Sequence, residues 1–317
     1  LLCLVHYNRS ISYLTMQNLG YEIQAHPDRF FPVPPNYAVK EHKSTNPAIH
    51  SHKGQEHASL YRKYRFPPSS EIPKLAFNFL KEKREPPFAL VADVGCGSGQ
   101  STPGLAPYFQ KVVGVDISEA QISEARQNTT EPNISYCISI ADKLPFDDCS
   151  VDLVTSTTAC HWFNLDKFFK EADRVLKPNG CLALQTLSGY IPLRYKDRSE
   201  GISQVYKEAM EFLFEYAHDC FLHVRNRYTL IYEAVPYTEK KKVDDISLTF
   251  QMTVSELLGL LESLYMYQTY KALDPEAAKE FLPSTQKRML EALGVTSMDT
   301  KVDFVAEFYC VVARKPA

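Results

Sequence analysis

The sequence has no excess of charge of either sign. Of its 317 residues, 35 are Lys or Arg and 38 are Asp or Glu, which gives a formal net charge of -3 at pH 7. A chain without a global positive field has no long-range attraction for a nucleic-acid backbone or an acidic membrane surface. We therefore expect no nucleic-acid partner and no membrane partner.

Paired cysteines and long apolar runs are also missing. The eight cysteines are scattered singly, with no C-x-x-C pair and no ligand-like spacing to histidine. This pattern predicts no metal site and reduced thiols in a cytoplasmic protein. The opening LLCLVHYNRS has an apolar stretch of about five residues, which is too short for a signal core or a membrane span.

A sustained hydrophobic period is absent from residues 1–55, which are rich in Pro, His, Asn and Ser. They predict a poorly ordered leader, and without an initiator Met we expect the natural start nearer Met16. The other residues are apolar enough to bury a large core. We expect an α/β core over 56–187 and a helical cap with closing antiparallel strands over 188–317, in a monomer or weak homodimer.

Short apolar strands alternate with helices through the expected core. The predicted strands of this part are 88–94, 111–116, 134–140, 151–157 and 180–187. Strands joined by helical crossovers pair in parallel and carry helices on both faces. Two later strands, 245–252 and 301–315, complete a doubly wound, mostly parallel, seven-stranded α/β sheet, with the last strand antiparallel at its edge.

The segments between and around the late strands are predicted to be helical. Helices within 190–240 and 253–293 are expected to roof the carboxyl ends of the strands, with Thr253 and Asp274 as N-caps. The run KKK at 240–242 is expected to be a solvated loop.

The first predicted strand runs into a glycine-rich turn, VADVGCGSGQST, at residues 91–102. Gly95, Gly97 and Gly99 follow a G-x-G-x-G spacing, and position 100 is Gln. A dinucleotide site requires G-x-G-x-x-G, and no phosphate-binding G-x-x-x-x-G-K-[ST] is present. The spacing therefore disfavours a nicotinamide oxidoreductase, although the bare turn still lets a ligand approach the backbone.

Two acidic residues indicate which ligand approaches this turn. Asp93, still on the strand, would repel a pyrophosphate but helps to hold an ammonium group, directly or through water. Asp116 ends the second strand about 20 residues after the first glycine, where an acid accepts ribose hydroxyls. An ammonium group and a ribose without phosphate describe S-adenosylmethionine.

Four stretches in order carry a family resemblance. LVADVGCGSGQST, VVGVDISEAQISEAR, ADKLPFDDCSVDLVTSTTACHWFN and VLKPNGCLAL resemble the successive motifs of class I S-adenosylmethionine-dependent methyltransferases, which have a Rossmann-like fold. The segments HWF, at 161–163, and YRKYRFPP, at 61–68, resemble more narrowly the small-molecule enzymes of the trans-aconitate methyltransferase-like group. The resemblance covers about residues 57–187 strongly.

The resemblance implies a set of residues that bind the cofactor. Gly95, Gly97 and Gly99 would line its methionine portion, and Asp93 would support the loop and the amino group. Cys96, inside the loop, would be a small filler and not a nucleophile, because no histidine is linked to it in sequence.

The resemblance also implies the contacts of the nucleoside. Asp116 would bind the ribose, and Ile117 would lie beside the adenine. Ala141 and Asp142 follow the third strand, where relatives bind the adenine amino group, although SIAD here replaces their GDA pattern. Tyr61 and Arg65 are implied near the cofactor, and here Arg65 is followed by Phe where relatives have R-P-x-Y-P.

The acceptor is less defined by sequence. His161 is either a general base or a hydrogen-bonded wall residue, and Trp162 either contacts substrate or packs under the following helix. A carboxylate acceptor would need no base, whereas a hydroxyl would. A strongly anionic acceptor would require arginines, of which four are available in the cap or serve as surface charges: Arg194, Arg198, Arg225 and Arg227.

The function that these patterns favour is methyl transfer to a carboxylate or hydroxyl oxygen of a small molecule. One alternative is a catalytically silent S-adenosylmethionine-binding partner protein. Another is a protein or nucleic-acid methyltransferase. A base-modifying enzyme would show (Asn/Asp)-Pro-Pro-(aromatic) after the fourth strand, where this chain has TTACHWFN.

Overall fold

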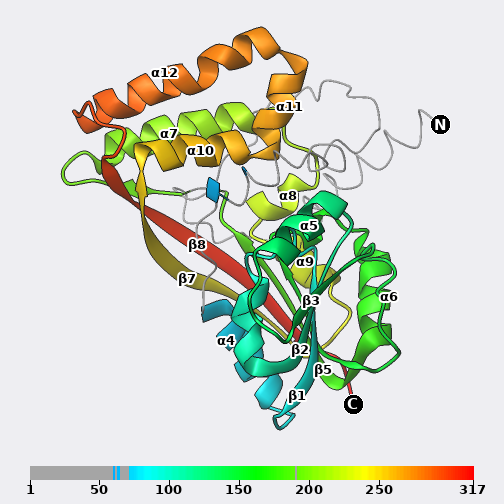
Figure 1. Cartoon of the computed structure of the whole chain (residues 1–317). Helices are drawn as coiled ribbons and strands as arrows, with labels where there is room; N and C mark the ends of the chain where they lie inside the picture. Colours follow the sequence, from blue (N-terminus) through cyan, green and yellow to red (C-terminus); the bar gives the residue numbers. More distant parts are fainter. Residues whose placement is uncertain (1–59, 61–62, 65–70, 190) are drawn as a thin grey trace, which may run out of the picture. The chain divides into compact units, whose positions relative to one another are not determined.

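The computed structural model describes residues 60, 63–64, 71–189 and 191–317. The predicted leader, Tyr61 and Arg65 lie outside these residues. Within them the chain forms one eight-stranded sheet (Figure 1). Its strands are β1 (Phe88–Val94), β2 (Phe109–Asp116), β3 (Ile134–Ile138), β4 (Val151–Thr157), β5 (Leu176–Leu187), β6 (Leu193–Arg194), β7 (Lys240–Thr253) and β8 (Lys301–Arg314).

The sheet confirms the predicted doubly wound, mostly parallel class. The strand order is β3-β2-β1-β4-β5-β8-β6, with β7 also paired to β8. The strands from β3 to β5 are parallel, whereas β8 runs antiparallel to β5, β6 and β7. The carboxyl end of β1 and its glycine turn therefore lie in the middle of the parallel part of the sheet.

Three details of the predicted sheet are wrong. The two-residue strand β6 makes eight strands instead of seven. Strand β8 is antiparallel as expected but not at the edge, because β7 covers its outer side. The run 240–242 belongs to β7, where Lys240 donates to the carbonyls of Tyr232 and Val235. Lysines suit an outer strand because they discourage pairing with other chains.

Helices lie on both faces of the sheet and around its carboxyl end. They are α4 (Glu71–Lys81), η2 (Thr102–Tyr108), α5 (Glu119–Gln127), η3 (Cys160–Trp162), α6 (Leu165–Val175), α7 (Ser199–Phe214), α8 (Phe221–Arg225), α9 (Thr229–Ala234), α10 (Val254–Ser263), α11 (Tyr265–Leu273) and α12 (Pro275–Leu293). Helices α6 and α9 share one hydrophobic cluster with the sheet, whereas α5 packs in a separate cluster behind β2 and β3.

Side-chain caps set several helix starts. Ser118 accepts from the backbone N–H of Gln121 at α5, and Asp274 accepts from that of Ala277 at α12. At α10, Thr253 and Glu256 form a reciprocal capping box. These contacts satisfy N–H groups that have no partner within the helix.

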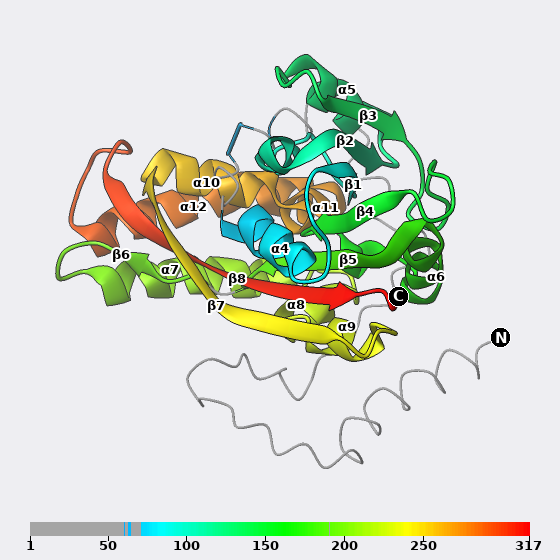
Figure 2. The same cartoon turned by 90° about the horizontal axis from the view of Figure 1, so that it is seen from below.

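The helical cap differs from the prediction in its layers. Helices α7, α8, α10 and α11 line a cavity at the carboxyl ends of the strands. Helix α12 packs outside this layer against α7, α10 and α11, and α9 lies on the face of the sheet (Figures 1 and 2). The segment expected as one helix, 253–273, is broken at Leu264, whose backbone is extended.

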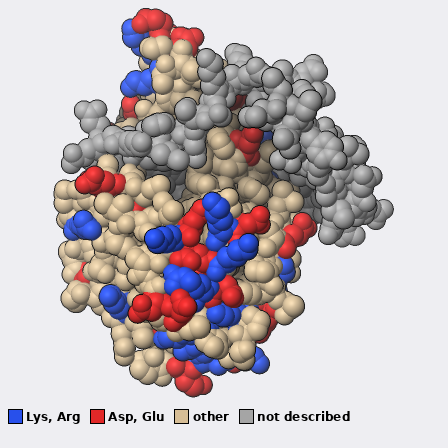
Figure 3. All heavy atoms as spheres, turned by 90° about the vertical axis from the view of Figure 1, so that its right-hand side faces the viewer, with Lys and Arg blue, Asp and Glu red and all other residues tan. Residues whose placement is uncertain are grey.

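The surface beside α6 carries charges of both signs. In Figure 3, which shows the right-hand side of Figure 1, acidic and basic side chains lie next to one another instead of in separate fields. Among the described residues no helix is both long and apolar enough to cross a bilayer.

Candidate active site

One large cavity opens where the parallel strands end. Its volume is about 1240 Å³, and its wall includes the turns after β1 to β4 together with the inner helices of the cap. Cavities for drug-sized ligands are usually about 300–1,000 Å³, so this one has room for two small molecules. Sheet order divides it into one half at β1, β2 and β3 and another at β4, β5 and β8.

The glycine turn exposes its backbone in the first half. Gly97 has a φ of +54°, and an added Cβ would meet only Gln121 Oε1, at 3.8 Å, so the side facing the cavity is open. Its N–H donates to Asp116 Oδ2 at 2.9 Å, which fixes the turn to the end of β2. Gly95 also lines the cavity, and its N–H donates to the Val115 carbonyl.

Gly99 and Cys96 hold the back of this turn. An added Cβ at Gly99 would lie 2.5 Å from the Tyr136 hydroxyl, and Gly99 is not part of the cavity wall. Its predicted contact with the ligand is therefore replaced by close packing on Tyr136. Cys96 lines the cavity, its side chain clusters with Ile122 and Ala125, and burial raises the pKa of the thiol well above the usual value.

Asp93 lies under the turn and not in the cavity wall. Its side chain is fully buried, and Oδ2 accepts from the Thr102 hydroxyl at 2.7 Å and the Ser101 hydroxyl at 3.4 Å. Burial raises its pKa to about 6. Oδ1 is buried without a partner among the described residues. Instead of pointing into the cavity, this carboxyl anchors the start of η2.

Asp116 faces the cavity at the end of β2. Besides the bond to Gly97, its Oδ1 accepts from the Ser118 N–H at 2.9 Å. Burial raises the pKa of this carboxyl, and the backbone donors oppose that shift. A carboxylate has about four lone-pair positions, so Asp116 can still accept from a ligand hydroxyl beside these backbone donors. Next to it, Ile117 is 55% exposed in the cavity wall.

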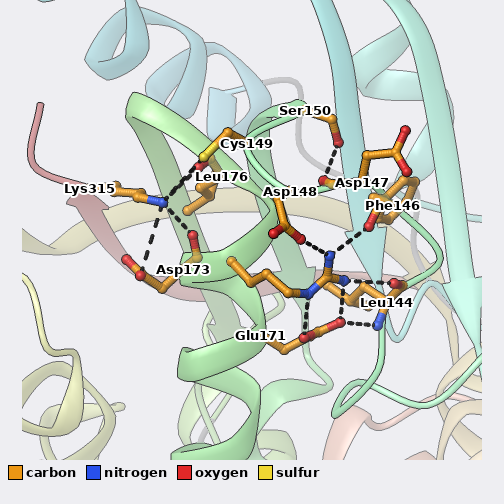
Figure 4. A network of polar contacts seen from close by, with 11 residues as sticks. Leu144, Phe146, Asp147, Asp148, Cys149, Ser150, Glu171, Asp173, Leu176 and Lys315 are labelled. Carbon is orange, nitrogen blue, oxygen red and sulfur yellow. Dashed lines mark hydrogen bonds and ion pairs between the residues drawn. The ribbon is translucent and has the colours of Figure 1, made fainter.

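Ala141 and Asp142 line the same half, beyond β3. Asp142 Oδ2 lies 3.6 Å from Lys167 Nζ at the start of α6. The chain that follows is fixed by α6, because Arg174 donates to the carbonyls of Leu144 and Phe146 (Figure 4).

Glu171 completes this attachment by accepting from the Leu144 N–H at 2.6 Å and from Arg174. Arg174 also pairs with Asp148 at 2.7 Å. The network therefore positions the segment after β3 against α6 without using any residue of the cavity.

His161 and Trp162 stand between the two halves, after β4. His161 is 5% exposed, and its Nδ1 lies 2.9 Å from the Tyr228 hydroxyl. Burial lowers its pKa to about 3, so the ring is neutral at pH 7. The Trp162 ring contacts the rings of Tyr265 and His218. Both residues belong to the cavity wall.

Most side chains of the second half were not predicted from sequence. Its wall residues from β5, β8 and the cap are mostly apolar or aromatic: Gln185, Leu187, Ser188, Gly189, Ile191, Tyr206, Met210, Phe221, Val224, Leu260, Leu264, Tyr265, Met266 and Phe308. In sequence their spacing is that of ordinary core positions. Only the position of Gln185 and Leu187 at a strand end pointed to a site.

The four arginines of the cap are not part of the described cavity wall. Arg225 lies over the Phe214 ring and Arg227 over the Tyr309 ring. Arg194 and Arg198 are exposed. The charged residues of the described wall are all acidic: Asp116, Glu119 and Asp142.

Comparison with known proteins gives the family. Residues 92–184 match the model of a methyltransferase domain. A methyltransferase-family protein of Dictyostelium discoideum is 30% identical over 258 residues, which cover 80% of this chain and 92% of that protein. The methyltransferase-family protein CRG1 of Saccharomyces cerevisiae is 31% identical over 41% of this chain and 46% of its own length.

The solved structures agree in fold. A methyltransferase-family protein from Anaeromyxobacter dehalogenans superposes with a TM-score of 0.63 at 22% identity, over 80% of this chain and 99% of its own. The chain therefore belongs to the class I S-adenosylmethionine-dependent methyltransferases. It is an enzyme of methyl transfer, and S-adenosylmethionine is its cofactor.

Proposed function

We propose that this enzyme transfers a methyl group from S-adenosylmethionine to an oxygen atom of a small, largely apolar molecule. The observation that carries the proposal is one cavity whose half at β1, β2 and β3 presents the glycine turn and Asp116 and whose half at β5, β8 and the cap is mostly apolar. The first suits the methyl donor and the second suits the acceptor.

The donor half fits the cofactor through its own chemistry. The open backbone at Gly97 would hold the methionine portion, with Gly95 beside it in the cavity wall, and Asp116 would accept the two ribose hydroxyls. The exposed side chain of Ile117 offers an apolar surface to the adenine, and Ala141 and Asp142 would face its amino group. Asp93 would act through the loop, by way of Thr102.

The bound cofactor supplies an electrophilic methyl group on sulfur. The chain's own contribution is position, since holding two reactants in line reduces the barrier by up to about 7–11 kcal/mol in favourable cases. Trp162 and the aromatic side chains of the wall would limit the access of water where the two halves meet.

The lining favours a hydroxyl over a carboxylate as the acceptor. A buried anion requires a cation or several donors to offset the loss of hydration. The described wall has no Lys or Arg, and its three charged residues are acidic. A tricarboxylate such as aconitate fits this electrostatic environment poorly, which separates the proposal from the trans-aconitate methyltransferase-like group.

A small acceptor is favoured over a polymer by the cap. The acceptor half is lined by residues of α7, α8, α10 and α11, such as Met210, Leu260 and Tyr265. A protein or nucleic acid would need an open groove. A catalytically silent partner protein is disfavoured because a neutral histidine lines the cavity where an acceptor would lie.

The test begins with calorimetric titration of S-adenosylmethionine and S-adenosylhomocysteine, with NADH as the negative control. The protein is then incubated with methyl-labelled donor and matched panels of apolar alcohols, phenols and carboxylic acids. We expect labelled ethers, which resist alkali. Alkali-labile label would identify a carboxyl ester, and tight donor binding without product from any panel would support the silent partner.

A further inference from the structure

A buried tyrosine far along the chain holds the histidine at the centre of the cavity. Tyr228 is 0% exposed, and its hydroxyl lies 2.9 Å from Nδ1 of His161, 67 residues away. This pair was not apparent from sequence, because Tyr228 occurs in a helical stretch without any motif. It joins the segment between α8 and α9 to the turn after β4.

The backbone of Tyr228 is in a conformation that bulky residues seldom adopt. Its φ is +59° in the left-handed region, directly before α9. The N–H donates to the His223 carbonyl at 2.9 Å, and the carbonyl accepts from Tyr232 at 2.8 Å. Left-handed non-glycine residues persist where their surroundings hold them and are found often at functional sites.

The bond to Tyr228 determines which ring nitrogen of His161 serves the cavity. Nδ1 is occupied by the tyrosine, and His161 lines the cavity. Nε2 is not one of the buried polar atoms that lack a partner. It is therefore the nitrogen that remains accessible to an acceptor molecule.

We propose that Tyr228 is a positioning residue for methyl transfer: its hydroxyl accepts the Nδ1–H of His161 and so keeps Nε2 unprotonated and directed at the acceptor hydroxyl. This inference rests on the proposed function. As the acceptor oxygen bonds to the methyl carbon, the carbon–sulfur bond breaks, its electron pair stays on sulfur, and the hydroxyl proton moves to Nε2. The imidazolium then returns this proton to water.

The groups facing His161 explain why the tyrosine matters. The ring contacts the Tyr228 hydroxyl and lies near His223 on α8, and the Cys160 thiol of the same turn interacts with Tyr228. Burial raises the pKa of the Cys160 thiol to about 12 and that of Tyr228 well above its usual value, and it lowers that of His223. All are neutral at pH 7, so the Tyr228 hydroxyl is the dipole in direct contact that can stabilise a protonated His161.

The low pKa of His161 also determines at which step of the reaction the proton is transferred. A ring that burial holds neutral at pH 7 has its lone pair free, but it is too weak a base to remove the proton of an alcohol beforehand. The proton therefore moves while the methyl group is transferred. Orientation of Nε2 at that moment is what Tyr228 provides.

The first experiment determines which ring nitrogen of His161 carries the proton in the wild-type protein. In spectra of the protein labelled with nitrogen-15 histidine, the His161 signals are identified by their loss in His161→Gln. We expect a protonated Nδ1 and an unprotonated Nε2 at pH 7. The opposite tautomer would overturn the proposal, and this readout needs no acceptor and no folded variant of Tyr228.

The second experiment compares Tyr228→Phe with Tyr237→Phe. Tyr237 is a matched control because it is also buried and its hydroxyl donates to Asp173 at 3.1 Å, away from the cavity. With the acceptor found in the panels, Tyr228→Phe should lower kcat about 10- to 100-fold, the effect of losing a hydrogen bond to a charged group. Its affinity for S-adenosylhomocysteine should stay within twofold, and Tyr237→Phe should retain kcat.

The outcomes separate the two proposals. Wild-type kcat in Tyr228→Phe, or an unchanged Nδ1 signal in that variant, overturns the positioning role while methyl transfer itself stands. Absence of methyl transfer to every panel compound from the wild type contradicts the proposed function, and the ring tautomer still decides whether Tyr228 holds His161 as stated.

Discussion

The two halves of the cavity are built in different ways. The donor half comes mainly from one stretch, residues 94 to 142, and consists of a bare backbone turn, a carboxylate and other short turns. The acceptor half is assembled from β5, β8 and four helices between residues 185 and 308, and it uses side chains. A cofactor that never changes can be recognised by local backbone geometry, whereas an acceptor is recognised by whatever the cap places opposite it.

The halves also differ in charge. Two carboxyl groups whose pKa values burial raises lie at the donor half, Asp116 in the cavity wall and Asp93 beneath the turn. At the acceptor half the histidine stays neutral. Substitutions in the donor half should therefore change the affinity for the cofactor and leave the affinity for the acceptor nearly unchanged, and the reverse should hold for the acceptor half.

The largest expected effect is on cofactor binding by Asp116→Ala. The substitution removes two bonds to the backbone at Gly97 and Ser118 as well as the proposed ribose contacts. We expect at least about a 100-fold weaker Kd for S-adenosylhomocysteine by calorimetry, since hydrogen bonds to a charged group are worth about 1.5–3 kcal/mol each.

Asp142→Ala is the comparison for this prediction. Asp142 would contact only the adenine amino group and shares its partly exposed carboxylate with Lys167, whereas Asp116 would bind both ribose hydroxyls and also holds the turn. A partly exposed contact of this kind contributes at most about 1 kcal/mol. We expect its Kd to change by less than about fivefold. If the two variants bind alike, Asp116 does not have the role proposed for it.

A smaller effect is expected in the pH dependence of stability for Asp93→Asn. The folded pKa of Asp93 is raised to about 6, above its usual 3.8, so the folded state holds a proton that the unfolded state has lost between these values. Its contribution to stability is present below pH 4 and is lost as pH rises toward 6. Relative to the variant, the unfolding free energy of the wild type should fall by up to about 1.4 kcal/mol per pH unit in this window.

Urea unfolding at pH 4, 5, 6 and 7 measures this difference, because His161 titrates equally in both proteins and cancels. Parallel curves would show that Asp93 is ionised at its ordinary pKa. Binding of S-adenosylhomocysteine should weaken less in Asp93→Asn than in Asp116→Ala, because Asp93 supports the turn through Thr102 and lies outside the cavity wall.

The donor half could be predicted from the sequence because local motifs build it. The alternation of strands and helices gave the doubly wound sheet, and the Ser118, Thr253 and Asp274 caps are where patterns predict them. The sequence did not predict which residues of the glycine motif face the cavity. Asp93 bonds to Thr102 and Gly99 packs on Tyr136, so neither belongs to the cavity wall.

The acceptor half could not be predicted because its residues meet only through tertiary structure. Tyr228 reaches His161 across 67 positions, and its left-handed backbone has no sequence pattern. Met210 and Leu260 have the helical spacing of core residues, so nothing local separates a wall residue from a packed one. Strand β8 was placed at the edge because its pairing with β7 depends on the cap.

The smallest expected effect is that of Trp162→Phe on binding of the acceptor. The indole packs edge-on against Tyr265 at a ring distance of 5.0 Å, and the smaller ring of phenylalanine weakens this contact and removes part of the wall. An aromatic pair contributes about 0.5–1.5 kcal/mol, so KM for the acceptor should rise about three- to tenfold. The Kd for S-adenosylhomocysteine should remain within twofold, because Trp162 adjoins β4 and not the turns that hold the nucleoside. A larger loss of cofactor affinity than of acceptor affinity would mean that the boundary between the halves lies beyond Trp162, on the side of β5.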